Sequence, residues 1–568
     1  MLDVTAAVYG ASVRTRSNCD PLTKLWPIRT PIVKLFLLAS LAVLVHGYHL
    51  GADDAAIYVP AIKRAANPKL YPFGAEFFMS HARLSLFSDL VGASARVSHL
   101  PINFVIFFWH AGCVFFLLAA SWQLVKVCFV NDAARWSGVA LLAATLSVPV
   151  AGTALVIMDP YVTARSLSTP ATIFAIACYV AKKPLWAVAW LTLTALVHPQ
   201  MGVYAIGFLS SFWMTNRVQI PAQPRVKHAV ASFGLPFVFE LQPARGAARE
   251  ALLSRTYFFV SQWAWYEWVG VFAPLALAWW CCSRKVNGTT PLFRSLVKAL
   301  IPFGLAFTTA ALVLTCSPRF ENFTRLQPMR CFHVIYVIFF LMLGGVAGEY
   351  VLRSSLWRWM SLFAPLAVAM YFVQQAQFPC SPHVEWPGYL SQNRWNSTFL
   401  WIQAHTPVDA VFALDPKYMR SPGEDLHGFR ALAERSALAD VVKDSGAVSL
   451  FPNMADEWKS EVAAQSGWDK FERCDFEHLA TLYPVTWIVV TRSPGPAGLA
   501  CPYEDGGLSV CRISSRSSVR DRSSMTSSAC PATNPQAVIP GDRPGVGAQS
   551  ELQKPFAAVR SRFGDSMK

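Results

Sequence analysis

Two adjacent carboxylates, Asp53 and Asp54, are the residues of this sequence whose types and spacing best suit chemistry. They follow an apolar run that ends at Val45, so they lie close to the end of a predicted membrane span. Ionisable groups are costly there and are usually retained for chemistry or transport. A carboxylate can take a proton from a substrate, and like-charge repulsion raises the pKa of one member of such a pair. The alternative is a solvated acidic loop with no chemical role.

Five further polar residues are candidates for ligand binding: Asp159, Arg165, His198, Arg325 and Arg330. Asp159 and Arg165 share a short loop, in which Asp159 could instead cap a helix. His198 occupies a tight turn, where a lone histidine is more commonly a structural hydrogen-bond partner than a catalyst. Arg325 and Arg330 precede an apolar segment. A guanidinium binds phosphate through paired hydrogen bonds, and the alternative is that both side chains extend toward lipid headgroups.

The composition assigns these residues to a membrane protein. The chain has 568 residues, of which 54% are hydrophobic and 15% are charged, whereas soluble domains average roughly 25% charged residues. A net charge of +15 would suggest nucleic-acid binding in a soluble protein. Here much of the positive charge lies in short loops between apolar segments, where Lys and Arg determine topology. We therefore expect no nucleic-acid partner.

Apolar segments of roughly 20 residues predict an all-α polytopic membrane protein with about eleven transmembrane helices. The first helix follows a polar cytoplasmic tail, residues 1–30, and is a signal anchor because no small-residue cleavage site ends it. The transmembrane domain covers residues 31–378. Its predicted spans are 32–45, 101–123, 135–153, 166–181, 184–198, 200–215, 228–241, 264–282, 298–316, 331–350 and 357–377.

The loop charges predict the orientation of these helices. Counted from a cytoplasmic N-terminus, the inner loops carry a regular excess of Lys and Arg. Two outer loops are exceptions: one contains Arg245, Arg249 and Arg255, and the other contains Arg319, Arg325 and Arg330. An anionic ligand on the outer side would explain these positive charges. An odd number of spans places the chain after residue 378 outside.

The first outer loop, residues 51–100, contains two amphipathic patterns. One covers residues 57–65, with Lys63 and Arg64 opposite its apolar face, and the other runs from Phe77 to Val91. Helices of this kind lie in the membrane interface instead of crossing the bilayer. We therefore predict two interfacial helices close to the Asp pair.

Residues 379–513 have the pattern of an extracytoplasmic α/β domain. Predicted strands are 410–414, 447–451 and 487–490, predicted helices are 431–444 and 455–482, and a hairpin covers 501–513. The turn near Gly506 brings Cys501 opposite Cys511, so we predict a disulfide in an oxidising outer compartment. Residues 514–568 are rich in Ser, Arg, Pro and Gly without periodicity, which predicts a disordered tail.

This layout resembles the integral-membrane glycosyltransferases of the GT-C superfamily. The resemblance covers roughly residues 30 to 515 and rests on the acidic pair, the number of spans, the interfacial helices and the outer C-terminal domain. The segment from Gly51 to Pro60 is similar to the first-loop motif of bacterial members. Residues 433–436 (AERS) and 450–453 (LFPN) are similar to a bacterial domain of unknown function.

The resemblance implies an enzyme that transfers a sugar from a polyprenyl-phosphate-linked donor to an envelope acceptor on the outer face. It implies a catalytic carboxylate at Asp53 or Asp54. We favour Asp54, with the other residue as the N-cap of a helix over 55–66. The pair could instead hold a divalent cation, Mg²⁺ or Mn²⁺, near the leaving phosphate. The implied substrate-binding residues are Arg330, Arg325, Arg165, Asp159 and His198. The implied partners are the lipid-linked donor and the lipids of a bacterial inner membrane.

Two other classes of function remain open. A transporter or flippase of a lipid-linked anion would use the same arginines along its route. Against it, the sequence has no internal repeat and no charged residue in the middle of a span, two features common in transporters. A non-catalytic scaffold would use its outer domain to bind envelope partners. Convergence of Asp53, Asp54 and the Arg330 loop on one cavity would favour the enzyme over the scaffold.

Overall fold

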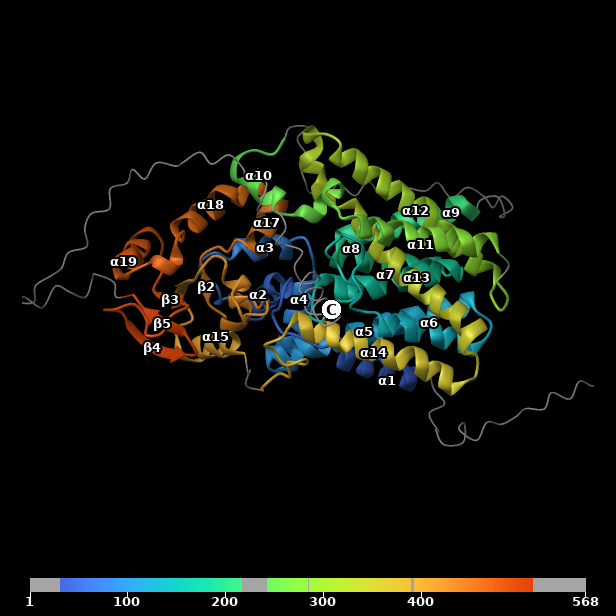
Figure 1. Ribbon diagram of the computed structural model, residues 1–568, viewed down its shortest axis with the longest axis horizontal. Helices are drawn as coiled ribbons and strands as arrows, with labels where there is room; N and C mark the ends of the chain where they lie inside the picture. Colours follow the sequence, from blue (N-terminus) through green and yellow to red (C-terminus); the bar gives the residue numbers. More distant parts are fainter. Residues whose placement is uncertain (1–30, 217–242, 285, 390–392, 514–568) are drawn as a thin grey trace, which may run out of the picture.

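The structure is a computed structural model that describes residues 31–216, 243–284, 286–389 and 393–513. The predicted cytoplasmic tail 1–30, the predicted span 228–241 and the predicted disordered tail 514–568 lie outside the described residues. The described chain has two regions. A helical bundle contains most of the predicted spans, and a smaller C-terminal α/β region packs against one end of it (Figure 1).

A helix occupies all or part of each of the ten predicted spans in the described residues. These helices are α1 (Pro31–His46), α5 (Ile102–Cys128), α6 (Asp132–Ala144), α7 (Ala164–Val180), α8 (Pro184–Val197), α9 (Pro199–Asn216), α11 (Trp265–Ser283), α12 (Pro291–Thr315), α13 (Phe332–Ala347) and α14 (Leu356–Gln377). Eight of them, all except α8 and α14, contribute to one apolar core that includes the fully buried side chains of Leu117, Val139, Phe208 and Ile335.

The predicted count of about eleven membrane spans is not supported. Four helical stretches of the described chain are long and apolar enough to cross a membrane: Ile102–Cys128, Pro291–Thr315, Pro318–Leu352 and Leu356–Gln377. Helices α1 and α8 are apolar but have only 16 and 14 residues. At 1.5 Å per residue, 14 residues extend about 21 Å, well short of a hydrocarbon core of about 30 Å. A hydropathy window scores an apolar run without showing where its helix begins and ends.

The first-loop helices lie between the bundle and the C-terminal region (Figure 1). They are α2 (Ala55–Ala66), α3 (Glu76–Ala82) and α4 (Phe87–Ser98). No residue of α2 is exposed, and Val59 and Ile62 are fully buried. Protein therefore covers the apolar face of α2, and its predicted place at the membrane interface stays a prediction. An apolar helix face has the same sequence pattern whether lipid or protein covers it.

The C-terminal region contains a five-stranded mixed sheet in the order β2-β1-β3-β5-β4. Its strands are β1 (Val411–Ala413), β2 (Ser436–Ala437), β3 (Trp487–Val490), β4 (Ala500–Asp505) and β5 (Leu508–Arg512). Strand β1 pairs in parallel with β2 and β3, and β5 is antiparallel to both β3 and β4. The α/β prediction and the strands near 410–414 and 487–490 are confirmed.

Two local predictions in this region are wrong. The predicted helix 431–444 contains only the end of α16 (Phe429–Ala433) and the start of α17 (Asp444–Leu450), because residues 436–437 form strand β2 on the edge of β1. The predicted strand 447–451 is mostly helix α17. The remaining helices are α10 (Gly246–Leu253), α15 (Arg394–His405), α18 (Ala455–Ala464) and α19 (Arg473–Leu482), so the predicted helix 455–482 is divided into two.

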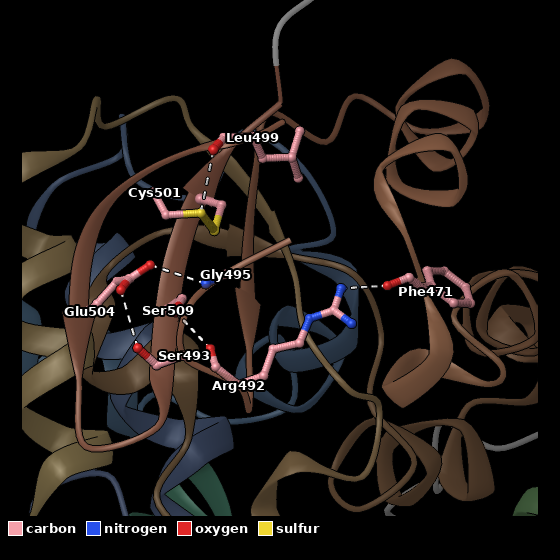
Figure 2. Close-up of a disulfide and its surroundings, with 9 residues drawn as sticks. Phe471, Arg492, Ser493, Gly495, Leu499, Cys501, Glu504 and Ser509 are labelled. Carbon is pink, nitrogen blue, oxygen red and sulfur yellow. Dashed lines mark hydrogen bonds between the residues drawn. A yellow bond between two sulfur atoms is a disulfide. The ribbon is translucent and has the colours of Figure 1, made fainter. Parts of the chain in front are cut away.

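The predicted hairpin and disulfide are confirmed at the end of the described chain (Figure 2). Strands β4 and β5 flank the turn at Gly506 and Gly507, and a disulfide joins Cys501 to Cys511 across them. The Glu504 carboxylate accepts hydrogen bonds from the Ser493 hydroxyl and the Gly495 amide, both at 3.1 Å. These bonds attach the hairpin to the loop that follows β3.

Candidate functional site

The loop that carries the Asp pair passes between the bundle and the C-terminal region. The amide of Asp53 donates to the Leu426 carbonyl at 2.8 Å, and the Gly51 carbonyl accepts from the Gly428 amide at 3.0 Å. Gly51 has a φ of +79°, and a Cβ on it would lie 2.8 Å from the Cβ of Ala431. Only glycine fits this close approach without strain. Backbone contacts therefore fix the position of the pair relative to both regions.

One ammonium group, that of Lys443, contacts both carboxylates. Its Nζ forms an ion pair with Asp53 Oδ1 and lies 3.2 Å from Asp54 Oδ1. The second oxygen of Asp53 accepts a hydrogen bond from the Tyr161 hydroxyl at 2.9 Å. The second oxygen of Asp54 lies 3.4 Å from Arg165 Nη2. Lys443 precedes α17 in the C-terminal region, so this ion pair joins residues from both regions.

Neither Asp residue caps helix α2. Asp54 holds the N-cap position but makes no side-chain capping hydrogen bond. Asp53 has a φ of +49° and precedes the cap. The first amides of the helix donate instead to the backbone carbonyls of residues 52–54, and the carboxylates contact the Lys443 and Arg165 cations. The capping alternative for this pair is therefore wrong.

Asp159 positions Arg165. Its Oδ2 accepts from Arg165 Nη2 at 2.8 Å and from the Thr163 hydroxyl at 3.2 Å, and both charged side chains are buried. Thr163 caps helix α7 in a capping box with Ser166. The capping role that the sequence left open for Asp159 therefore belongs to Thr163. Burial raises the pKa of Asp159, although the adjacent Arg165 guanidinium lowers it.

A cavity of about 360 Å³ lies beside this cluster. Asp54, Arg165, His198, Arg325 and Arg330 all line it, together with two residues that sequence analysis did not select, Arg255 and Lys443. Most of the remaining lining is apolar and includes Ile57, Leu84, Val197, Phe307, Leu314 and Leu450. Asp53 and Asp159 do not line the cavity but hold Lys443 and Arg165, which do. The structure thus brings all seven candidate residues into one neighbourhood.

Three arginines of this cavity, Arg255, Arg325 and Arg330, form no ion pair among the described residues, and the Nε of each has no hydrogen-bond partner. Arg255 donates to the Val442 carbonyl and the Ser445 hydroxyl. The Arg330 guanidinium lies 5.2 Å from the ring centroid of Tyr257, a cation–π contact. Arg325 and Arg330 are half-buried, and cations that lose contact with water are normally paired. Their exposure to a common cavity therefore favours an anionic ligand.

The charges around Asp54 determine its protonation. Burial raises the pKa of this carboxyl, but the cations of Lys443, Arg165 and Arg330 outweigh burial and lower it far below the ordinary range. Burial lowers the pKa of Lys443, and Asp53 and Asp54 outweigh burial to raise it. Asp54 is therefore a carboxylate at every physiological pH and a weak base while the cavity contains no anion.

His198 behaves as the structural alternative expects. It follows helix α8, its side chain is half-buried, and its Nδ1 accepts from the Met201 amide at 3.4 Å. Burial lowers its pKa to about 3, and the nearby cations Arg165 and Arg330 act in the same direction. The neutral ring lines the cavity without adding charge to it.

The Asp pair does not fit a divalent cation in this arrangement. Both carboxylates are oriented toward the Lys443 ammonium, and Arg165 neutralises Asp54 on its other side. In the part of the chain that the structure describes, one group has the spacing of metal ligands, and it consists of His49, Glu385 and His427 instead. Neither Asp53 nor Asp54 belongs to that group.

Comparison with known proteins identifies no relative. No protein-family model matches this chain, and no curated protein matches it.

Proposed function

We propose that this chain is a membrane glycosyltransferase of the GT-C type that uses a polyprenyl-phosphate-linked sugar donor. The observation that supports the proposal is one cavity lined by Asp54, by five cationic side chains and by a largely apolar remainder. The proposed location is a bacterial inner membrane, with the N-terminus inside and the C-terminal region outside. The four candidate membrane helices are compatible with this location.

The lining of the cavity suits both parts of a lipid-linked phosphate. Arg325 and Arg330 carry charges that no carboxylate of the described chain neutralises, so they suit a phosphate or diphosphate. Helix α12, one of the candidate spans, contributes Phe307, Ala310 and Leu314 to the same cavity. A polyprenyl chain could lie along these residues toward the surrounding lipid. An amphiphilic cavity of this kind favours a lipid-linked anion over a free sugar.

Binding of the donor would also activate Asp54. A phosphate between Arg330 and Lys443 adds negative charge and draws both cations toward itself. Both effects raise the pKa of a neighbouring carboxyl group. Asp54 would then be a stronger base in the donor complex than in the free protein, and it could take the proton of an attacking acceptor hydroxyl.

The test is Asp54→Asn, which keeps the shape of the side chain and removes its basicity. Transfer should fall by roughly 10²–10⁴-fold, the usual size of a general-base contribution. The melting temperature should change little, because Asp53 still pairs with Lys443. The measurement is mass spectrometry of envelope glycans and glycolipids from a deletion strain that carries each variant.

Two variants provide the controls. Asp53→Asn should cause a smaller loss, because Asp53 contacts Lys443 and Tyr161 but does not line the cavity. Asp89→Asn changes an exposed carboxylate of the same loop and should have no effect. Wild-type glycan profiles for the single and double Asn variants at residues 53 and 54 would refute the proposal that this chain is a glycosyltransferase.

A transporter or flippase of a lipid-linked anion is the second candidate. The observation that favours it is the strong ion pairing of Asp54, which makes this carboxylate a poor base in the free protein. Such a transporter needs the arginines but no base. It would predict an unchanged glycan product from Asp54→Asn and lost binding of a lipid phosphate after Arg330→Ala.

A further inference from the structure

A second cluster of ionisable residues includes one residue of the loop that carries the Asp pair. It joins His49, Glu385 and His427, which come from the loop after α1, the segment after α14 and the C-terminal region. Glu385 Oε1 lies 3.2 Å from His49 Nδ1 and 2.7 Å from His427 Nε2. Both histidine side chains are buried, at 1% and 0% exposure, and Glu385 is 13% exposed. No step of the proposed function uses these residues.

Neighbouring backbone groups orient two of the three side chains. His427 Nδ1 lies 3.1 Å from the Glu424 carbonyl, which can only accept, so Nδ1 carries a proton and Nε2 faces Glu385. The Leu50 amide donates to Glu385 Oε2 at 2.8 Å, which leaves Oε1 directed at the two imidazoles. A hydrogen bond from the second ring nitrogen to a backbone carbonyl is a regular feature of metal-binding histidines. Among the described residues, His49 Nε2 has no hydrogen-bond partner. Binding of an ion at Nδ1 would therefore break no hydrogen bond at Nε2.

We propose that His49 Nδ1, Glu385 Oε1 and His427 Nε2 bind a divalent transition-metal ion of the zinc type. Two imidazoles and one carboxylate are a known zinc ligand set that leaves the fourth tetrahedral position open. The three donor atoms lie within 4.8 Å of one another. Tetrahedral zinc with bonds of about 2.0–2.1 Å places its donors about 3.3 Å apart. The distances from Glu385 Oε1 to the two imidazoles, 3.2 and 2.7 Å, are close to this value, and the two histidine nitrogens would have to approach each other by up to about 1.5 Å.

The ion would hold the Asp loop in place. His49 precedes Asp53 by four residues, and the Asp53 amide bonds Leu426, the neighbour of His427. The ion would thus attach this loop to both the bundle and the C-terminal region. This attachment of the loop does not depend on the reaction that the cavity performs.

The test is the metal content of the full-length protein, purified in detergent without a polyhistidine tag and dialysed against a low concentration of Zn²⁺. We expect elemental mass spectrometry to find about one zinc ion per chain. The melting temperature should be higher with Zn²⁺ than after chelation. His49→Gln, His427→Gln and Glu385→Gln should each weaken zinc binding by more than about 10-fold, since changes around the ligands alone cost roughly 10–100-fold.

His405→Gln is the matched control, because His405 is exposed on α15 outside the cluster. It should bind zinc as the wild type does. Equal zinc content in the wild type and the His49→Gln/His427→Gln double variant would overturn the proposal. If the double variant does not fold, the chelated wild-type protein decides. Its melting temperature must rise on addition of Zn²⁺, and no rise would also overturn the proposal.

Discussion

At the scale of single residues, the site has one cation shared between two carboxylates that have different surroundings. Asp53 forms an ion pair with Lys443 and accepts a hydrogen bond from the Tyr161 hydroxyl. Asp54 contacts Lys443 and Arg165 and lines the cavity. The segment is a turn, with a φ of +49° at Asp53 and −66° at Asp54, so both carboxylates reach Lys443 although only Asp54 lines the cavity. We infer that Asp53 is a positioning residue for Lys443 and that Asp54 contacts the ligand.

The first prediction at this scale concerns Arg330. Arg330→Ala should weaken binding of a polyprenyl phosphate by roughly 10- to 100-fold, the loss expected for a hydrogen bond to a charged group. Arg330→Lys should restore it only in part, because an ammonium lacks the planar fork of the guanidinium. The measurement is a titration of the purified protein with the polyprenyl phosphate in detergent micelles.

The control for Arg330 is Arg319→Ala, because Arg319 is an exposed arginine in the same loop that does not line the cavity. It should bind the lipid phosphate as the wild type does. Unchanged binding in Arg330→Ala and in the Arg325→Ala/Arg330→Ala double variant would show that this loop contacts lipid headgroups instead.

At the scale of the secondary-structure elements, helix α2 connects the bundle to the C-terminal region. Lys63 on α2 is only 2% exposed, and its Nζ lies 2.7 Å from Glu434 Oε1 and donates to the Ala431 carbonyl at 2.8 Å. Glu434 follows α16, and burial raises its pKa while Lys63 outweighs burial and lowers it. The pair therefore attaches α2, and with it Asp54, to the region that provides Lys443.

We predict that Glu434→Gln destabilises the protein by about 3 kcal/mol or more, because it leaves the Lys63 ammonium buried without a counter-charge. Lys63→Met should cost less, since Glu434 is 17% exposed and can reach water. The measurement is the melting temperature in detergent.

An exposed ion pair provides the comparison for Glu434. Lys459→Met removes the pair between Lys459 and Glu250, whose side chains are 48% and 55% exposed. Surface pairs of this kind contribute about 0–1 kcal/mol. Similar melting temperatures for Glu434→Gln and Lys459→Met would mean that the Lys63 pair does not hold α2.

At the scale of the whole molecule, the C-terminal region packs against one end of the bundle (Figure 1). The cavity lies at this end, because Lys443 and Leu450 of the C-terminal region line it together with residues of the bundle. Helix α7 begins beside Asp54, where Arg165 lies, and its 17 residues extend about 25 Å away from the cavity. Lys182 and Lys183 follow its far end. The basic loop and the C-terminal region therefore occupy opposite ends of the molecule.

The corresponding prediction concerns topology. Reporter fusions at residue 183 and near residue 440 should lie on opposite sides of the membrane, inside and outside respectively. The physical reasons are the positive-inside rule for the Lys182 and Lys183 loop and the length of α7. Activity of an alkaline phosphatase reporter at 440 and its absence at 183 would support this orientation, and equal activity at both positions would refute it.

The sequence by itself determined the features that depend on neighbouring residues. Apolar runs located the helices, short continuous apolar runs located β1 and β3, and the turn at Gly506 with its flanking cysteines located the hairpin and its disulfide. It also selected the Asp pair, Arg325 and Arg330. These signals suffice because hydrogen bonds within a helix or a hairpin join residues close in the chain.

Only the tertiary structure decided which helices are long enough to span a membrane, that protein covers α2, and that residues 436–437 form a strand beside β1. It also decided the partners of the candidate residues. Lys443 reaches Asp53 and Asp54, and His427 reaches Glu385 near His49, across long stretches of chain. Whether two charged side chains form a pair depends on their distance in space. A sequence does not show which residues far apart in the chain lie within a few ångströms of each other.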